Sequence, residues 1–417
     1  MGEILFLCHR VPFPPDRGDK IRSHHLLKGL AKLAPVHVGT FAENAQDRAQ
    51  DPALAQLAAS HLLVDRDMSL PKAGLRALAS GRPVSLPAFA DRRLSRWVAQ
   101  TLAGRDIDTV VIFSGQMGQY IPEGFTGRVV VDLCDVDSAK FETYAAEAGF
   151  PKSWLMAREA RLLAEWTAIV GAHLAQHTRP DRLDCTLLIS DNERALFRSR
   201  LPAGADCDVR ALGNGIDAAF FDPVATLEHP DLTATPGPHF VFTGQMDYPP
   251  NIAAVERFAR AILPRLRETV EARFQIVGRA PTAEVTRLGD EPGVTVWGEV
   301  PDVRPFLAAA SAVVAPLTLA RGVQNKVLEA MAMARPVLLS SEAATGIEAR
   351  DGEQFTICRD DTAFVAAAGE ITADQTRAEA MGRAARAFVM AEMSWEAVEA
   401  QLAPIVGRGQ GGPHHAA

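Results

Sequence analysis

A cation, a carboxylate and a glycine stand close together in the stretch RGVQNKVLE, residues 321–329. Gly322 permits a tight turn into a helix that we expect from about Val323 to Ala334, and the first-turn N–H groups of a helix have no partner inside it. The same end of the helix dipole attracts an anion such as a diphosphate. Lys326 and Glu329 share one helical face, so Lys326 can neutralise a phosphate while Glu329 accepts hydrogen bonds from two vicinal hydroxyls, as in a ribose. An amphipathic helix with an internal Lys–Glu pair has the same spacing.

A second group of polar residues follows the expected first strand, in the segment HRVPFPPDRGDK, residues 9–20. Prolines stiffen this loop, and Gly18 begins the next helix, where its backbone amides can meet a phosphate or a sugar. Four cations, Arg10, Arg17, Lys20 and Arg22, suit either an anionic lipid-phosphate acceptor or a solvated basic loop.

These groups must be positioned by alternating strands and helices. Apolar runs separated by helix-like stretches predict parallel sheets covered on both faces. The main helices are expected at Gly18–Leu33, Pro151–Ala175, Ile252–Arg267 and Trp395–Val406. The strands are expected at Ile4–Cys8, Val36–Phe41, Thr109–Phe113, Arg128–Asp132, Cys185–Ile189, Val209–Leu212, His239–Thr243, Phe274–Val277, Val294–Trp297, Ser311–Ala315, Pro336–Leu339 and Phe355–Cys358. The pattern stops in the turn-rich segment 213–238 and then restarts, which predicts two doubly wound α/β domains in tandem.

Composition excludes several classes of protein. The chain has 417 residues, a formal net charge of −8 and five cysteines with no C-x-x-C pair, which argues against nucleic-acid binding, a disulfide framework and a zinc site. It shows no signal peptide and no run of about 18 apolar residues, so we expect a cytoplasmic protein. No G-x-G-x-x-G follows a strand, which disfavours a nicotinamide or flavin enzyme.

The segments resemble glycosyltransferase family 4, which has the GT-B fold. Residues 321–337 are similar to the donor-site motif of that family: a Glu, seven residues, a second Glu, then Ala-Met-Ala, a small residue and Pro-Val. The form G-x-x-N-K-x-x-E resembles a bacterial exopolysaccharide branch, the sugar transferases associated with PEP-CTERM and exosortase. Weaker similarities cover most of the chain, at Gly213–Asp217, Phe242–Asn251, Ile276–Arg279, Trp297–Val303 and Met393–Glu396.

The resemblance implies two tandem Rossmann-like domains of α/β class, facing each other across a cleft. The N-terminal acceptor-side domain would span 1–212, a linker 213–238, and the C-terminal nucleotide-sugar-binding domain 239–393. Residues 394–406 would form a helix that packs back on the N-terminal domain, followed by a flexible tail at 407–417.

The resemblance also implies a set of site residues. Those expected to bind the donor are Gly18, Gly244, Gln245, Arg279, Val300, Arg321, Gly322, Val323, Gln324, Asn325, Lys326 and Glu329. Glu329 matches the acid that holds the ribose, whereas Arg321 stands where the family has its first acid, a departure that affects contacts to the sugar hydroxyls. Gly244 is expected to end a strand and Asn251 to cap the next helix.

Asp135, Lys326 and Arg279 are the candidates for catalysis. Asp135 and Asp137 mimic the D-x-D metal motif of the other glycosyltransferase fold, but GT-B enzymes steady the diphosphate with helix dipoles and basic residues, so we expect no metal. Asp135 would orient an acceptor or sugar hydroxyl. The alternative is that Asp135 or Asp137 caps the following helix.

The expected activity is that of a retaining glycosyltransferase that moves a sugar from a nucleoside-diphosphate sugar to a hydroxyl acceptor in exopolysaccharide biosynthesis, without a cofactor. The acceptor would be a lipid-linked oligosaccharide, reached by peripheral contact with the inner face of the plasma membrane. Two alternatives stay open: a nucleotide-sugar 2-epimerase, which shares the two-domain architecture, and a non-catalytic partner that binds nucleotide or glycan.

Overall fold

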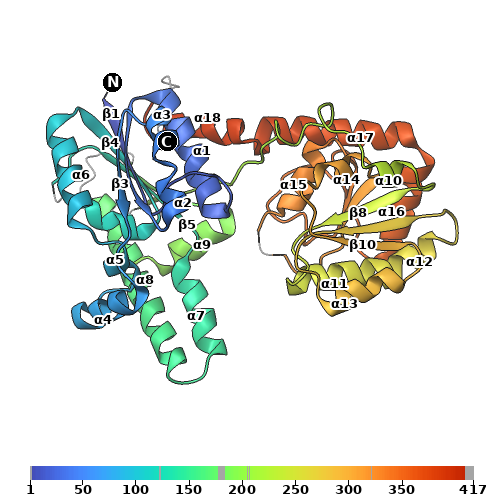
Figure 1. The fold of residues 1–417 in the computed structure, drawn as a ribbon, viewed down its shortest axis with the longest axis horizontal. Helices are drawn as coiled ribbons and strands as arrows, with labels where there is room; N and C mark the ends of the chain where they lie inside the picture. The colour runs from blue at the N-terminus through green and yellow to red at the C-terminus, as the bar shows by residue number, and fades with distance from the viewer. Residues whose placement is uncertain are drawn as a thin grey trace. The chain divides into compact units, whose positions relative to one another are not determined.

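The computed structural model describes residues 2–121, 124–176, 184–203, 205, 207–320 and 322–408, and for 171–176 it describes the backbone alone. The chain divides into two compact units (Figure 1). Unit 1 comprises residues 1–214 and 398–417, and unit 2 comprises residues 215–397. Each unit is described by itself below.

Unit 1 is built on a seven-stranded sheet with the order β3-β2-β1-β4-β5-β6-β7, in which all neighbouring strands are parallel. Strand β2 is buried along its whole length and β4 along its last five residues, as is usual for a parallel sheet that helices cover on both faces. The strands are β1 Glu3–Cys8, β2 Val36–Ala42, β3 Ser60–Asp65, β4 Ile107–Phe113, β5 Arg128–Cys134, β6 Cys185–Leu188 and β7 Asp208–Ala211.

The helices of unit 1 follow the strands in sequence. They are α1 Gly18–Leu33, α2 Ala45–Arg48, α3 Asp51–Leu57, α4 Leu70–Ser80, α5 Ser85–Ala88, α6 Arg92–Gly104, a 3-10 helix at Gly115–Tyr120, α7 Asp137–Glu147, α8 Lys152–Gln176 and α9 Asp191–Arg200. The expected bounds of α1 are confirmed, and α8 agrees with its expected bounds to within one residue.

Unit 2 repeats the architecture with a six-stranded parallel sheet in the order β10-β9-β8-β11-β12-β13. Its strands are β8 His239–Thr243, β9 Arg273–Val277, β10 Val294–Gly298, β11 Ala312–Ala315, β12 Val337–Leu339 and β13 Thr356–Ile357. The prediction of two Rossmann-like α/β domains in tandem is therefore confirmed.

The helices of unit 2 include one long helix that runs from α11 through a π-turn into α12. The helical segments are α10 Pro230–Thr233, α11 Pro249–Arg257, the π-turn Phe258–Ile262, α12 Leu263–Leu266, α13 Ala283–Arg287, a 3-10 helix at Leu288–Asp290, α14 Arg304–Ala308, α15 Asn325–Ala332, α16 Asp361–Ala373, α17 Gln375–Phe388 and a second π-turn at Val389–Met393. The last helix, α18 Trp395–Ile405, begins in unit 2 and continues into unit 1.

Two segments connect the units along the chain. Residues 215–238, expected as a linker, bury Ile216, Phe221 and Leu232 in the core of unit 2. The second segment is α18, whose residues from Val398 onward group with unit 1. There a Cβ atom on Gly29 of α1 would lie 2.7 Å from Leu402 Cδ1, so α18 needs a glycine at this position in order to pack closely on α1.

Candidate functional site

The strand order of unit 2 places a topological switch point between β8 and β11. From this point the chain builds the sheet outward in both directions, so the loops after β8 and β11 diverge and leave a crevice at the carboxyl ends of the strands. Ligands of doubly wound folds bind in that crevice. The loops after β8 and β9 and the start of α15, which follows β11, carry most of the donor-binding residues expected from the sequence.

Two glycines bring the loops after β8 and β9 into contact. A Cβ atom on Gly278 would lie 1.6 Å from the carbonyl oxygen of Gly244, which leaves no room for a side chain. A Cβ atom on Gly244 would lie 3.2 Å from Lys326 Nζ. Gly244 follows the last residue of β8, as expected, and its lack of a side chain lets the backbone lie beside the lysine.

Helix α15 begins two residues later than expected, at Asn325, and ends at Ala332. Gly322 has a positive φ of 77°, so the expected tight turn before the helix is confirmed. Gln324 occupies the N-cap position, but its side chain does not cap the helix and donates to the Gly322 carbonyl. Val323 is half-buried and Asn325 is exposed. The N-terminal end of α15 therefore faces the crevice without a side-chain cap.

Lys326 lies at the centre of this end of unit 2. Its side chain is buried, and Nζ lies 4.3 Å from the centroid of the Phe242 ring and donates to Asn251 Oδ1 at 2.5 Å. Burial lowers the pKa of Lys326 to about 8, and the nearby Glu329 opposes that shift. A diphosphate would stabilise the charged form of this lysine.

Glu329 is half-buried one helical turn from Lys326. Burial raises the pKa of its carboxyl group to about 7, and the charge on Lys326 lowers it in part. Within the described residues, its carboxylate has no hydrogen bond or ion pair, so its acceptor capacity is open to a ligand. A buried carboxylate without donors costs stability, as is usual for residues kept for function.

The expectation that Asn251 caps a helix is wrong. Helix α11 starts at Pro249 with Tyr248 as its N-cap, so Asn251 lies inside the first turn. Its side chain instead accepts from Lys326 and donates from Nδ2 to the Gln245 carbonyl at 2.9 Å. Asn251 therefore ties the lysine to the loop after β8, a role that depends on a partner 75 residues away in sequence.

Arg279 and Gln245 pair at the rim. Arg279 Nη2 donates to Gln245 Oε1 at 3.0 Å, and the Gln245 and Arg279 side chains are exposed. The Met246 amide also donates to the Arg279 carbonyl, which fixes the two loops together. Val300 is half-buried on the core, in the loop after β10. Arg321 lies outside the described residues. The structure thus brings together Gly244, Gln245, Asn325, Lys326 and Arg279 in one region of unit 2.

Gly18 and Asp135 belong to unit 1. Gly18 begins α1, at the carboxyl end of β1, and a Cβ atom built on it would meet nothing within 4 Å. Asp135 follows β5 and pairs with Lys140 Nζ at 2.7 Å, while Asp137 is the first residue of α7. The alternative that either aspartate caps the helix is wrong, because Val136 is the N-cap and no side chain caps it.

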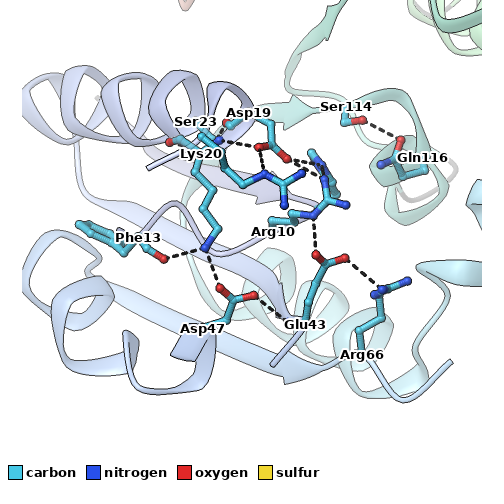
Figure 2. Close-up of polar contacts among 12 residues, drawn as sticks. Arg10, Phe13, Asp19, Lys20, Ser23, Glu43, Asp47, Arg66, Ser114 and Gln116 are labelled. Carbon is cyan, nitrogen blue, oxygen red and sulfur yellow. Dashed lines mark hydrogen bonds and ion pairs between the residues drawn. The ribbon is translucent and has the colours of Figure 1, made fainter. Parts of the chain in front are cut away.

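The cations that follow β1 are ion-paired in the fold, including the exposed Arg17, whose Nε lies 2.8 Å from Asp19 Oδ1. Figure 2 shows Arg10 held by Asp19 at 2.6 Å and by Glu43 at 2.8 Å. The buried Lys20 is paired with Asp47 at 2.6 Å. These ion pairs fix the loop against α1 and the segment after β2, so the interpretation as a solvated basic loop is wrong for these two cations.

Arg22 is fully buried and pairs with the fully buried Asp132 at 2.8 Å. It also donates to the carbonyl groups of Leu212 and Gly213. Arg22 therefore ties β5 and the residues just after β7 to α1. The sequence did not predict this structural role. Burial raises the pKa of Asp132, and Arg22 opposes the shift.

Other classes of site have little support in the described part of the chain. No disulfide joins any of the five cysteines, all of which lie within the described residues. No group of three or more His, Cys, Asp or Glu side chains is placed to hold a metal ion among the described residues. No helix in the described ranges has the length and apolar character that a membrane span requires.

Residues 237–374 match a family model described as glycosyl transferases group 1. The match lies inside unit 2 and includes β8, the whole of α15 and the loops between them. The expected enzyme class, a glycosyltransferase, is confirmed at this level. No curated protein sequence matches the chain.

The structure is similar along nearly its whole length to several solved structures. Sucrose-phosphate synthase from Thermosynechococcus elongatus has a TM-score of 0.59 and 16% identity, covering 98% of this chain and 99% of that one. HepE from Anabaena, in complex with UDP, has a TM-score of 0.61 and 15% identity, covering 97% and 99%. WaaG, a glycosyltransferase involved in lipopolysaccharide biosynthesis, has a TM-score of 0.55 and 16% identity, covering 97% and 100%. These similarities establish the GT-B fold.

Proposed function

We propose that this chain, whose unit 2 is a glycosyl transferases group 1 domain on a GT-B fold, moves a sugar from a nucleoside-diphosphate sugar to a hydroxyl acceptor with retention of configuration. One observation carries the proposal. At the switch point of unit 2, Lys326 and Glu329 occupy one face of α15, and Glu329 has no partner among the described residues. A cation and an open carboxylate at this spacing match a diphosphate and the adjacent ribose.

The diphosphate would bind at the start of α15. Its charge would be stabilised by Lys326, by the first-turn amide groups and by Arg279, which would turn from Gln245 towards the ligand. The same groups would stabilise the leaving diphosphate as the bond to the sugar breaks, so we propose that the protein itself supplies the positive charge and no metal is required.

Glu329 would hold the ribose. Its carboxylate would accept hydrogen bonds from two vicinal hydroxyls. The ligand would thus supply the hydrogen-bond donors that the described residues do not. Binding would also favour the ionised carboxylate and so lower its pKa from about 7. HepE has been crystallised with UDP and with UDP-glucose, which makes these the first ligands to test.

Unit 1 would provide the acceptor side. Asp135, after β5, would leave Lys140 to orient an acceptor hydroxyl, and the amides near Gly18 would face the transferring sugar. We propose a lipid-linked oligosaccharide of exopolysaccharide biosynthesis as the acceptor, on the sequence resemblance to that branch. The protein would then work in the cytoplasm, in peripheral contact with the inner face of the plasma membrane.

Calorimetric titration of UDP, GDP, ADP, CMP and dTDP tests the donor site. One nucleoside diphosphate should bind, and Glu329→Ala should weaken its binding about tenfold or more, since hydrogen bonds to a charged group contribute about 1.5–3 kcal/mol. Glu271→Ala is the matched control, because Glu271 is exposed and precedes β9, at the amino ends of the strands and away from the crevice. Equal affinity in the Glu329→Ala protein and the wild type would refute the assignment.

Product analysis then separates transfer from its alternatives. A transferase consumes the sugar nucleotide only when an acceptor is added, apart from slow hydrolysis. A 2-epimerase would convert it with no acceptor present, and a non-catalytic partner would bind it unchanged. Either of these last two results would overturn the proposed reaction while leaving the nucleotide site in place.

A further inference from the structure

Helix α4 of unit 1, Leu70–Ser80, presents its large apolar residues outward. Leu70, Leu75 and Leu78 are 63%, 70% and 50% exposed, whereas the residues that the helix buries are Ala73 and Ala77. A surface helix that packs only on its own protein normally buries its large apolar side chains and exposes its polar ones. The leucines of α4 therefore lack the contact that their residue type would suit.

The charge of the segment that contains α4 is one-sided. Residues 68–90 contain Lys72, Arg76 and Arg82 and no acidic residue, in a chain whose formal net charge is −8. With 3.6 residues per turn, Lys72 and Arg76 project beside the leucine arc, about 60–100° from Leu75. The helix thus has three sectors: alanines against the protein, leucines outward and cations beside the leucines.

A second exposed apolar element lies at the turn between α7 and α8. Phe150 and Trp154 are 85% and 56% exposed. Arg158 of α8 donates from Nη2 to the Ala77 carbonyl at 2.8 Å, so α8 is fixed against α4. Figure 1 shows α4 and the α7–α8 pair projecting from the same side of unit 1.

We propose that these elements form a docking surface for an anionic lipid bilayer, made by Leu70, Leu75, Leu78, Phe150 and Trp154. Helix α4 would lie in the plane of the interface, with its leucines among the acyl chains and its cations at the headgroups. Trp154 is of the type enriched at membrane interfaces, since its ring is apolar and its N–H group is polar.

Charge complementarity favours a lipid surface of negative charge as the occupant. Cations close to an anionic leaflet each add about 1 kcal/mol of attraction, and residues 68–90 offer Lys72, Arg76 and Arg82 without a carboxylate. In the turn between α7 and α8, the charges of Glu147 and Lys152 cancel, so the surface as a whole stays cationic. A second copy of this chain would bring the same cations to the interface, and like charges would then repel.

The inference extends the proposed lipid-linked acceptor, but the two can fail separately. Vesicle binding needs no donor, no acceptor and no catalysis, and the nucleotide site belongs to unit 2. If the protein binds nucleotide but does not bind vesicles, the docking surface alone is disproved. If it binds vesicles but no nucleotide, the donor site alone is disproved.

The test is flotation of the full-length protein with two kinds of vesicle. One kind is phosphatidylcholine alone, and the other also contains phosphatidylglycerol at about 30% of the lipid, which makes it anionic. We expect binding to the anionic vesicles that weakens as salt increases. Leu75→Ser/Leu78→Ser should reduce partitioning about tenfold or more, because each leucine loses its apolar burial. Lys72→Glu/Arg76→Glu should abolish the preference for anionic vesicles.

The matched control is Val224→Ser/Leu227→Ser, which removes two highly exposed apolar residues from unit 2. It should bind vesicles like the wild type, and all variants should keep the wild-type melting temperature because the altered side chains are exposed. The proposal is overturned if the wild type does not float, if neutral and anionic vesicles bind equally, or if the leucine variants bind normally. It is also overturned if size-exclusion chromatography with light scattering shows a dimer that the leucine variants dissociate.

Discussion

Replacing Glu329 with glutamine should stabilise unit 2 and weaken nucleotide binding at the same time. The carboxyl group has its ordinary pKa of 4.5 in the unfolded chain and a pKa of about 7 in the fold. A group whose pKa is raised by folding contributes stability at low pH that is lost as the pH rises through the folded-state pKa. The wild type therefore loses stability between about pH 4.5 and 7, and the neutral glutamine does not.

The size of the effect follows from the shift. A difference of about 2.5 pKa units corresponds to at most about 3.4 kcal/mol at pH 8, at about 1.36 kcal/mol per unit. Glu329 is half-buried, and solvent screening reduces this value to about 1–2 kcal/mol. For a domain of this size, each kcal/mol shifts the melting temperature by about 2–4 °C. We expect Glu329→Gln to melt about 2–8 °C higher at pH 8, with a difference of under about 0.5 kcal/mol at pH 4.5.

The assay is thermal unfolding of both proteins from pH 4.5 to 8.5, following the transition that shifts when nucleoside diphosphate is added. Ligand should raise the melting temperature of the wild type more than that of Glu329→Gln. A melting temperature for the variant that equals the wild-type value at pH 8, or a stability difference that does not depend on pH, would refute the assignment of the cost to the ionised carboxylate.

Two further changes test the packing. Gly278→Ala should destabilise unit 2 by about 3 kcal/mol or more and abolish nucleotide binding, because the added Cβ atom would overlap the Gly244 carbonyl; urea unfolding with wild-type stability would contradict this. Arg22→Met should destabilise unit 1 by about 3–5 kcal/mol in urea unfolding, because Asp132 stays buried without its partner. The double variant Arg22→Met/Asp132→Leu should regain most of that stability. Equal losses in the single and double variants would contradict the ion-pair argument.

The elements that the sequence predicts well are those fixed by local pattern. Helix α1 and strand β8 have their expected bounds, because a continuous apolar run or a helical period leaves no alternative. Strand β3 was not predicted. It lies at the edge of its sheet and is buried only at Leu63 and Val64, so its apolar pattern is too short to stand out.

The residues predicted less well depend on distant partners. Asn251 is of a residue type that often caps helices, but its side chain accepts a hydrogen bond from Lys326 in the fold. In the sequence, Arg22 looks like any cation in the first turns of a helix. Only the fold places Asp132, which is 110 residues away in sequence, against it. No local pattern carries this information. The Lys326–Glu329 pair was predictable because both residues lie on one short helix, where spacing alone sets their geometry.

The close packing of α18 on α1 sets an order for folding during synthesis. Residues 215–397 leave the ribosome as one uninterrupted segment, so unit 2 can complete its sheet while the last part of unit 1 has not been made. The face of α1 around Gly29 stays uncovered until Leu402 and Glu399 emerge. Unit 1, whose synthesis begins first, is thus completed last, and a message truncated before codon 398 would leave unit 2 joined to a unit 1 that lacks its final helical segment.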